Sequence, residues 1–130
     1  MKGYVFDAGA LIALERNSAF MLTILKQIRD GRVQAVLPRT VIAQVWRATP
    51  RQANVARLIN SGIQHDGAVI IDELTAERAR QIGIRIGAVH HPDIVDVHVA
   101  LAAVDHDHAV LTSDDADIAK VNSGLVLIHV

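Results

Sequence analysis

Carboxylate side chains at three separated places in this 130-residue sequence could together bind a cation. They are Asp7, then Asp93 and Asp96, then Asp114, Asp115 and Asp117. Taken singly, each suits a helix N-cap or first turn, where a short carboxylate accepts hydrogen bonds from free backbone N–H groups. Brought together, they would repel one another and raise each other's pKa unless a cation sat among them. Hard oxygen ligands select Mg²⁺ or Mn²⁺, which can activate a water for displacement at phosphorus.

The elements that must position these carboxylates alternate between strands and helices. Short apolar runs predict strands at 4–6, 33–37, 68–71, 109–112 and 125–130. Helical spacing with caps at Ser18 and Thr75 predicts helices ending near Leu14, over 18–30, 39–47, about 50–62, about 75–87, 94–104 and 115–121. We therefore predict an α/β fold with a parallel sheet covered on both faces, formed by one domain over residues 1–130.

This arrangement predicts where the carboxylates meet. Ligands of open parallel sheets bind outside the carboxyl ends of the strands. Asp7 and Asp114 follow predicted strands, and Asp96 opens a helix that can begin near the same edge. We therefore expect these side chains to share one site.

Composition excludes several classes of protein. The chain is 51% hydrophobic and 21% charged, as in a packed globular domain, and aromatic residues make up only 3%. The absence of cysteine excludes disulfides, thiolate metal sites and cysteine nucleophiles. No apolar run approaches the roughly 20 residues needed to cross a bilayer, and the N-terminus lacks the features of a signal peptide. A cytoplasmic protein that does not bind membranes is expected.

The two signs of charge are segregated along the chain. Residues 16–57 hold eight basic side chains and one acidic side chain, whereas residues 86–130 hold one lysine and seven aspartates. The net charges of these segments are therefore +7 and −6, which fits either two solvated faces or a basic polyanion-binding surface beside an acidic cation site. Arg39, Arg47 and Arg51 of the basic segment could contact RNA phosphates or an acidic partner segment.

Four segments resemble, in order and spacing, the acidic motifs of PIN-domain ribonucleases. They are YVFDAGALIAL (4–14), VIAQVWR (41–47), DVHVALAAV (96–104) and LTSDDADI (111–118). The length of the chain makes it similar to VapC-type toxins of type II toxin–antitoxin pairs. The resemblance implies a PIN-like three-layer α/β/α sandwich, Mg²⁺- or Mn²⁺-dependent cleavage of RNA, a VapB-type antitoxin as partner, and a homodimer.

The resemblance also implies roles for particular residues. Asp7, Asp96, Asp114 and Asp117 map to the acidic residues of the family, and the first three would ligate the metal. Gln44 stands where the family usually has a glutamate. Its amide oxygen can ligate Mg²⁺ but adds no negative charge, so weaker binding of a second metal is expected.

Three other classes of protein compete with this interpretation. An HD-type phosphohydrolase would use some of the seven histidines, but it would be entirely helical. A receiver-like signalling domain would have a phosphoacceptor after its third strand, where Asp72 stands, but it also needs a lysine after its last strand. A PIN-like module inactivated by Gln44 would only bind RNA or antitoxin. We expect Trp46 to pack in the interior, His98 to be packed or half-exposed, and His106 and His108 to be exposed turn residues.

Overall fold

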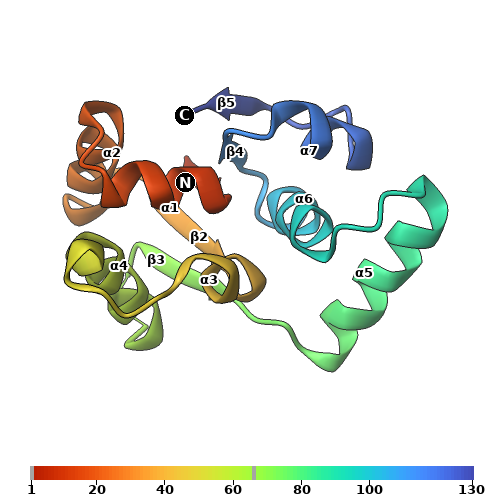
Figure 1. Cartoon of the computed structure of the whole chain (residues 1–130), viewed down its shortest axis with the longest axis horizontal. Coiled ribbons are helices and arrows are strands. Elements are labelled where there is room, and N and C mark those ends of the chain that lie inside the picture. The colour runs from red at the N-terminus through yellow and green to blue at the C-terminus, as the bar shows by residue number, and fades with distance from the viewer. Residues whose placement is uncertain (1, 66) are drawn as a thin grey trace.

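The computed structural model describes residues 2–65 and 67–130, and in these ranges strands alternate with helices along the chain (Figure 1). The strands are β1 (Gly3–Phe6), β2 (Gln34–Pro38), β3 (Val69–Asp72), β4 (Ala109–Thr112) and β5 (Leu127–His129). The helices are α1 (Ala8–Glu15), α2 (Ala19–Arg29), α3 (Arg39–Val45), the 3₁₀ turn η1 (Pro50–Gln52), α4 (Ala53–Ile63), α5 (Ala76–Val89), α6 (Ile94–His106) and α7 (Asp115–Val121). The predicted order of elements is confirmed, with ends shifted by a few residues.

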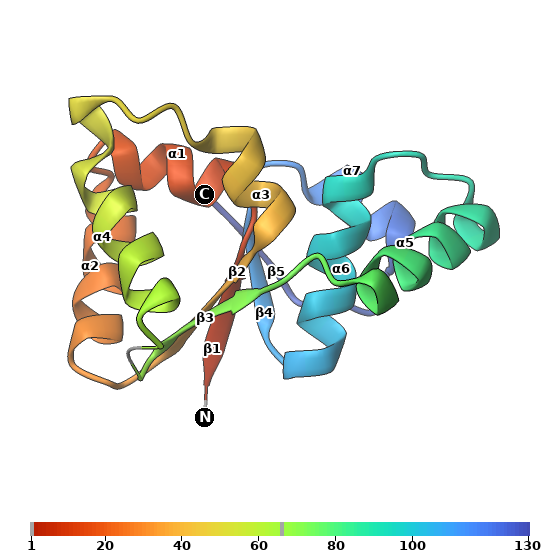
Figure 2. The ribbon, with the colours of Figure 1, turned by 90° about the horizontal axis from the view of Figure 1, so that it is seen from below.

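The strands form one parallel sheet in the order β3-β2-β1-β4-β5. Helices α1, α2 and α4 lie on one side of this sheet, and α5, α6 and α7 lie on the other (Figure 2). The predicted three-layer α/β/α sandwich is therefore confirmed. Because β1 is central, Asp7 at its end lies between the ends of β2 and β4.

Small aliphatic side chains fill the interior, which explains how the chain manages with so few aromatic residues. All four residues of β1 are buried, and Val36 and Leu37 of β2 are fully inaccessible to solvent. Helix α6 contributes Val99 and Ala102 to the same core. Continuous burial along the strands is what a sheet covered on both faces requires.

Side-chain caps fix where several helices begin. The Ser18 hydroxyl accepts from the backbone N–H of Met21 at 3.4 Å, and that of Thr75 accepts from Arg78 N–H at 3.0 Å. Both caps were predicted, and each satisfies a backbone donor that the helix itself leaves free. The N-terminal boundaries of α2 and α5 are therefore explained by sequence.

The prediction that Trp46 packs in the core is wrong. Helix α3 ends at Val45, and Trp46 follows in an extended conformation, so it leaves the buried stripe formed by Val41, Ile42 and Val45. Its side chain is 37% exposed. A helical pattern at the end of a segment cannot tell whether the helix still continues there.

The topology excludes two of the competing classes of protein. A receiver-like sheet has the strand order 2-1-3-4-5, whereas the order here is 3-2-1-4-5. A five-stranded sheet is also incompatible with an entirely helical HD-type fold. In the described parts of the chain no single helix is long and apolar enough to cross a membrane, although α1 and α2, which meet at 99°, pass that test as a pair.

Candidate active site at the carboxyl edge of the sheet

Asp7 is both a helix cap and a buried carboxylate at the sheet edge. Its Oδ1 accepts from the backbone N–H of Ala8 at 2.8 Å, and its Oδ2 accepts from the hydroxyl of Thr112 at 2.6 Å. Only 2% of Asp7 is exposed. The capping and site interpretations of Asp7 are therefore compatible, because one residue occupies both positions.

Thr112 links Asp7 to Asp114. While its hydroxyl donates to Asp7, the same oxygen accepts from the backbone N–H of Asp114 at 2.8 Å. Gly9 lets helix α1 come this close to the segment after β4, since a Cβ at Gly9 would overlap the side chain of Ser113. The sequences at 7–9 and 112–114 thus fit one another sterically as well as through hydrogen bonds.

Asp96 reaches this edge from the first turn of α6. Asp93 caps the helix, with its Oδ1 accepting from Asp96 N–H at 3.0 Å, which leaves the Asp96 carboxylate free of a capping role. Oδ2 of Asp96 accepts instead from Nε2 of His91, at 2.8 Å. Asp96 is 7% exposed.

The carboxylates influence each other electrostatically. Burial raises the pKa of Asp7, hydrogen bonds from Thr112 and Ala8 lower it, and the charges of Asp114 and Asp93 raise it further. Burial likewise raises the pKa of Asp96, His91 opposes this, and the charges of Asp93 and Asp7 add to the rise. Burial and the neighbouring aspartates therefore disfavour the ionised forms of Asp7 and Asp96. A bound cation would remove this penalty.

An open groove of about 480 Å³ begins beside Asp7. Ala8 and Gly9 line it together with Asp114, Gln44, Arg47 and Arg51. Glu15 lies in the same groove and is 4.0 Å from Arg51. The structure thus brings Gln44, Asp114 and two of the three predicted RNA-binding arginines to one surface.

Asp7, Asp96, Arg39 and Asp117 do not line this groove, and the last two make their contacts elsewhere. Arg39 makes two hydrogen bonds to Glu73, at 2.6 and 2.9 Å, and is absent from the groove lining. Asp117 lies in the first turn of α7, where it accepts from Lys120 at 3.4 Å. Neither residue is joined to Asp7 or Asp96 by a hydrogen bond in the described parts of the chain, so their predicted roles have less support than those of Asp7, Asp96 and Asp114.

The donor set suits a hard cation only in part. Two nearly buried carboxylates, Asp7 and Asp96, have no lysine or arginine as an ion-pair partner among residues 2–65 and 67–130, and Asp114 adds an exposed carboxylate beside them. In the same residues, however, no three histidine, aspartate or glutamate side chains are grouped closely enough to hold a metal ion. The carboxylate oxygens are ligands of the kind that Mg²⁺ prefers, but the side chains stand farther apart than the ligands of one bound ion.

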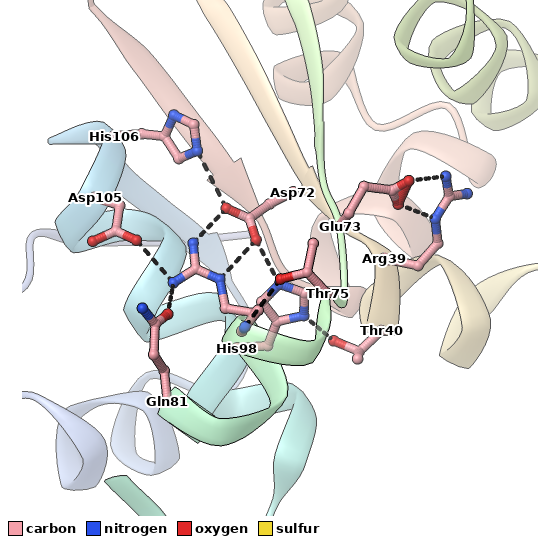
Figure 3. Close-up of polar contacts among 10 residues, drawn as sticks. Arg39, Thr40, Asp72, Glu73, Thr75, Gln81, His98, Asp105 and His106 are labelled. Carbon is pink, nitrogen blue, oxygen red and sulfur yellow. Dashed lines mark hydrogen bonds and ion pairs between the residues drawn. The ribbon is translucent and has the colours of Figure 1, made fainter. Parts of the chain in front are cut away.

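A second polar cluster, which the sequence did not predict, surrounds Asp72 at the end of β3 (Figure 3). Arg78 donates to both carboxylate oxygens of Asp72, at 3.0 and 2.7 Å, and contacts Asp105 at 2.8 Å. His98 donates through Nε2 to Asp72 at 2.8 Å, and its Nδ1 lies 2.7 Å from the hydroxyl of Thr40. This cluster joins α3, α5 and α6 to the sheet.

The cluster around Asp72 has a structural role rather than a catalytic one. Although burial disfavours its ionised form, hydrogen bonds from His98 and Arg78 hold the pKa of Asp72 well below its usual range. Thr40, His98 and Asp72 have the side-chain types of a nucleophilic triad, but the His98 side chain is completely buried and no substrate can reach it. Of the two positions expected for His98, packed or half-exposed, the structure shows the packed one.

The histidines at the end of α6 differ from expectation. His106 and His108 are half-buried, their rings stack 6.1 Å apart, and His106 lies 3.3 Å from Asp72. His108 contacts the Gln34 side chain at 2.7 Å. The exposed turn predicted for them is therefore wrong, because β2 and β3 supply polar partners that sequence spacing does not reveal.

The layers, the strand order and the position of the acidic site define a PIN-like α/β domain, and comparison with solved structures supports this fold. The structure of FitAB bound to an IR36 DNA fragment contains a chain that is 12% identical, with a TM-score of 0.57 over 97% of this chain and 94% of that chain. The crystal structure of FitAcB from Neisseria gonorrhoeae gives 15% identity and a TM-score of 0.52 over 96% of each chain.

Comparison by sequence alone gave no match. No protein-family model matches this chain, and no curated protein matches it. The similarity to FitAB and FitAcB therefore concerns the fold.

Proposed function

We propose that this chain is a Mg²⁺-dependent endoribonuclease, and that it is the toxin component of a type II toxin–antitoxin pair. The observation that carries the proposal is the placement of Asp7 and Asp96: two nearly buried carboxylates at the carboxyl edge of the sheet, raised in pKa and without an arginine or lysine partner in the described chain. A protein keeps such charge buried at a cost unless a ligand compensates it.

The acidic motifs of the sequence give this proposal its biological class, because they resemble those of PIN-domain toxins of type II toxin–antitoxin pairs. The fold agrees with this class. It is similar to that of chains in the structure of FitAB bound to an IR36 DNA fragment and in the structure of FitAcB from Neisseria gonorrhoeae. A cognate VapB-type antitoxin and assembly as a homodimer belong to the proposal, as does action in the cytoplasm, where its RNA substrate is found.

In this proposal the chain holds the cation through Asp7, Asp96 and Asp114. Mg²⁺ or Mn²⁺ would supply a Lewis acid that lowers the pKa of a water and neutralises phosphate charge. Thr112 orients the Asp7 carboxylate and fixes the start of the segment that carries Asp114. Asp117 and Gln44 are placed around these three ligands rather than among them. Asp117 pairs with Lys120, and Gln44 is exposed near the end of α3.

The groove beside the carboxylates would accept the RNA backbone. Arg47 and Arg51 line it together with Asp114, so a phosphate held by either arginine would lie next to the acidic edge. Phosphate contacts fix register and orientation without reading sequence. The chain therefore supplies general affinity through these arginines, and base selection needs other contacts.

Incubation of the purified protein with total RNA tests the proposal. We expect cleavage with Mg²⁺, loss of cleavage in EDTA, and recovery with excess Mg²⁺ or Mn²⁺, with cut ends mapped by sequencing. Asp96→Asn is the matched control for a contaminating nuclease. Cleavage that persists in EDTA, or in the Asp96→Asn protein, would contradict the proposal.

A second function, binding of RNA or antitoxin without catalysis, is favoured by Gln44 and by the absence of a three-ligand group in the described residues. It predicts RNA binding that neither Mg²⁺ nor EDTA changes, and no cut ends. Copurification with an antitoxin and sedimentation of the purified chain test the two protein partners.

A further inference from the structure

We propose that His91 is a positioning residue of the cation site, and that it acts by fixing the carboxylate of Asp96. This inference rests on the proposed function, because it takes Asp96 as a Mg²⁺ ligand. The contact that carries it is the hydrogen bond of 2.8 Å from Nε2 of His91 to Oδ2 of Asp96. The two side chains are only 14% and 10% exposed, so water competes poorly for this bond.

The backbone holds His91 in place. Helix α5 ends at Val89 and is capped by His90, which adopts the left-handed conformation with φ of 57° and donates its N–H to the carbonyl of Ile86. Pro92 restricts the chain on the other side, and Asp93 then caps α6. A residue placed between a helix end, a proline and a helix cap has little freedom, so the imidazole is presented to Asp96 at low entropic cost.

Asp96 needs such a partner more than Asp7 does. Both oxygens of Asp7 are held, one by Ala8 and the other by Thr112. Asp96, by contrast, has His91 as its only side-chain hydrogen-bond donor within residues 2–65 and 67–130, while the charges of Asp93 and Asp7 disfavour its ionised form. Without His91 the carboxylate would be free to turn away from this negative neighbourhood toward solvent.

The geometry also indicates which oxygen is available. Oδ2 is engaged by His91, which leaves Oδ1 of Asp96 to face a ligand. Outer residues that orient a metal ligand in this way typically contribute about 10- to 100-fold to metal affinity. His91 is thus expected to tighten binding of the cation without touching it.

Calorimetric titration of Mg²⁺ into the full chain tests the role of His91. We expect His91→Ala and His91→Leu, which remove the donor, to weaken Mg²⁺ binding by about tenfold. His91→Gln should restore most of the affinity, because its amide N–H can take the place of Nε2. His90→Asn is the matched control, since it changes the neighbouring exposed histidine and asparagine tolerates the left-handed conformation.

Thermal unfolding of each variant in EDTA separates loss of affinity from loss of fold, and His91→Leu keeps most of the packed volume if His91→Ala is unstable. Equal Mg²⁺ affinity for the wild type and a folded donor-free variant would overturn the inference while the proposed function stands. Affinity of His91→Gln as low as that of His91→Leu would also overturn it. A wild-type protein that takes up no Mg²⁺ would overturn both.

Discussion

The hydroxyl of Thr112 donates a hydrogen bond of 2.6 Å to Oδ2 of Asp7, and it joins residues 105 positions apart in the sequence. Both residues are buried, and they stand at the ends of neighbouring parallel strands. Hydrogen bonds to a buried charge are stronger than neutral ones and costly to break. This contact therefore fixes the acidic edge before any ligand binds.

Thr112→Val should destabilise the fold. The valine has the same shape but no hydroxyl, so the Asp7 carboxylate loses a hydrogen-bond donor and the Asp114 N–H loses its acceptor. We expect the free energy of unfolding to fall by about 1.5–3 kcal/mol, measured by urea denaturation at neutral pH. Thr23→Val is the control, because its hydroxyl bonds to Ala19 O on an exposed helix face. Equal stability of both variants would show that the Thr112 contact contributes little.

Asp7→Asn, Asp96→Asn and Asp114→Asn should each abolish RNA cleavage while the protein stays folded. Removal of one charge relieves repulsion among the aspartates, so in EDTA the Asp7 and Asp96 variants should be at least as stable as the wild type. Cleavage assays and thermal unfolding check the two halves of this prediction. A variant that cleaves normally would remove its residue from the site.

The stability gain of Asp7→Asn should depend on pH in a defined direction. Because the folded-state pKa of Asp7 lies above its ordinary value of 3.8, ionisation disfavours the folded state. The gain should thus be complete above the folded-state pKa of Asp7 and should vanish as the pH falls below 3.8, where Asp7 is protonated in both states. A gain that persists at lower pH would point to altered packing instead.

RNA cleavage should weaken as salt rises, because arginines that bind phosphates release counterions. Replacing Arg47 and Arg51 with glutamine should flatten the dependence of cleavage on salt, since both line the groove beside Asp114. The control is Arg32→Gln with Arg80→Gln, two exposed arginines elsewhere. Arg78 is unsuitable as a control because it is buried against Asp72. Identical salt slopes for the two double variants would place the RNA surface elsewhere.

Gln44→Glu should raise the affinity for Mg²⁺. Gln44 lines the same groove as Asp114, so a carboxylate there would add negative charge near the proposed cation. Calorimetry should give tighter binding, and the Mg²⁺ concentration for half-maximal cleavage should fall. Unchanged affinity, within the roughly 0.5 kcal/mol scatter of surface substitutions, would leave the aspartates as the ligands.

The order of the elements could be predicted because each boundary has a local cause. Ser18, Thr75 and Asp93 cap the helices that follow them, and the apolar strand runs read as buried on both faces. From a parallel sheet it follows that Asp7 and the segment after β4 meet at one edge. The proximity of Asp7 and Asp114 could thus be predicted from the sequence. The hydrogen bonds through Thr112 that connect them could not.

Pairing between distant side chains could not be predicted. Asp72 ends a strand and Asp7 follows one, yet their partners differ. Arg78 and His98 form ion pairs with Asp72, whereas within residues 2–65 and 67–130 only a hydroxyl and a backbone N–H donate to Asp7. The sequence offers both carboxylates as site residues. Which of the two carboxylates keeps an unpaired charge depends on how α5 and α6 pack against the sheet. The ion pair between Arg39 and Glu73 is likewise a contact between distant residues that the sequence does not reveal.

The central position of β1 has a consequence for how the protein is made. Asp7 emerges early in synthesis, but its partners Thr112 and Asp114 follow more than a hundred residues later. While β4 is still missing, one side of β1 is unpaired and the acidic edge is incomplete. Closing such a long loop is slow relative to local helix formation. The acidic edge can therefore form only after β4 and the segment that follows it have been synthesised.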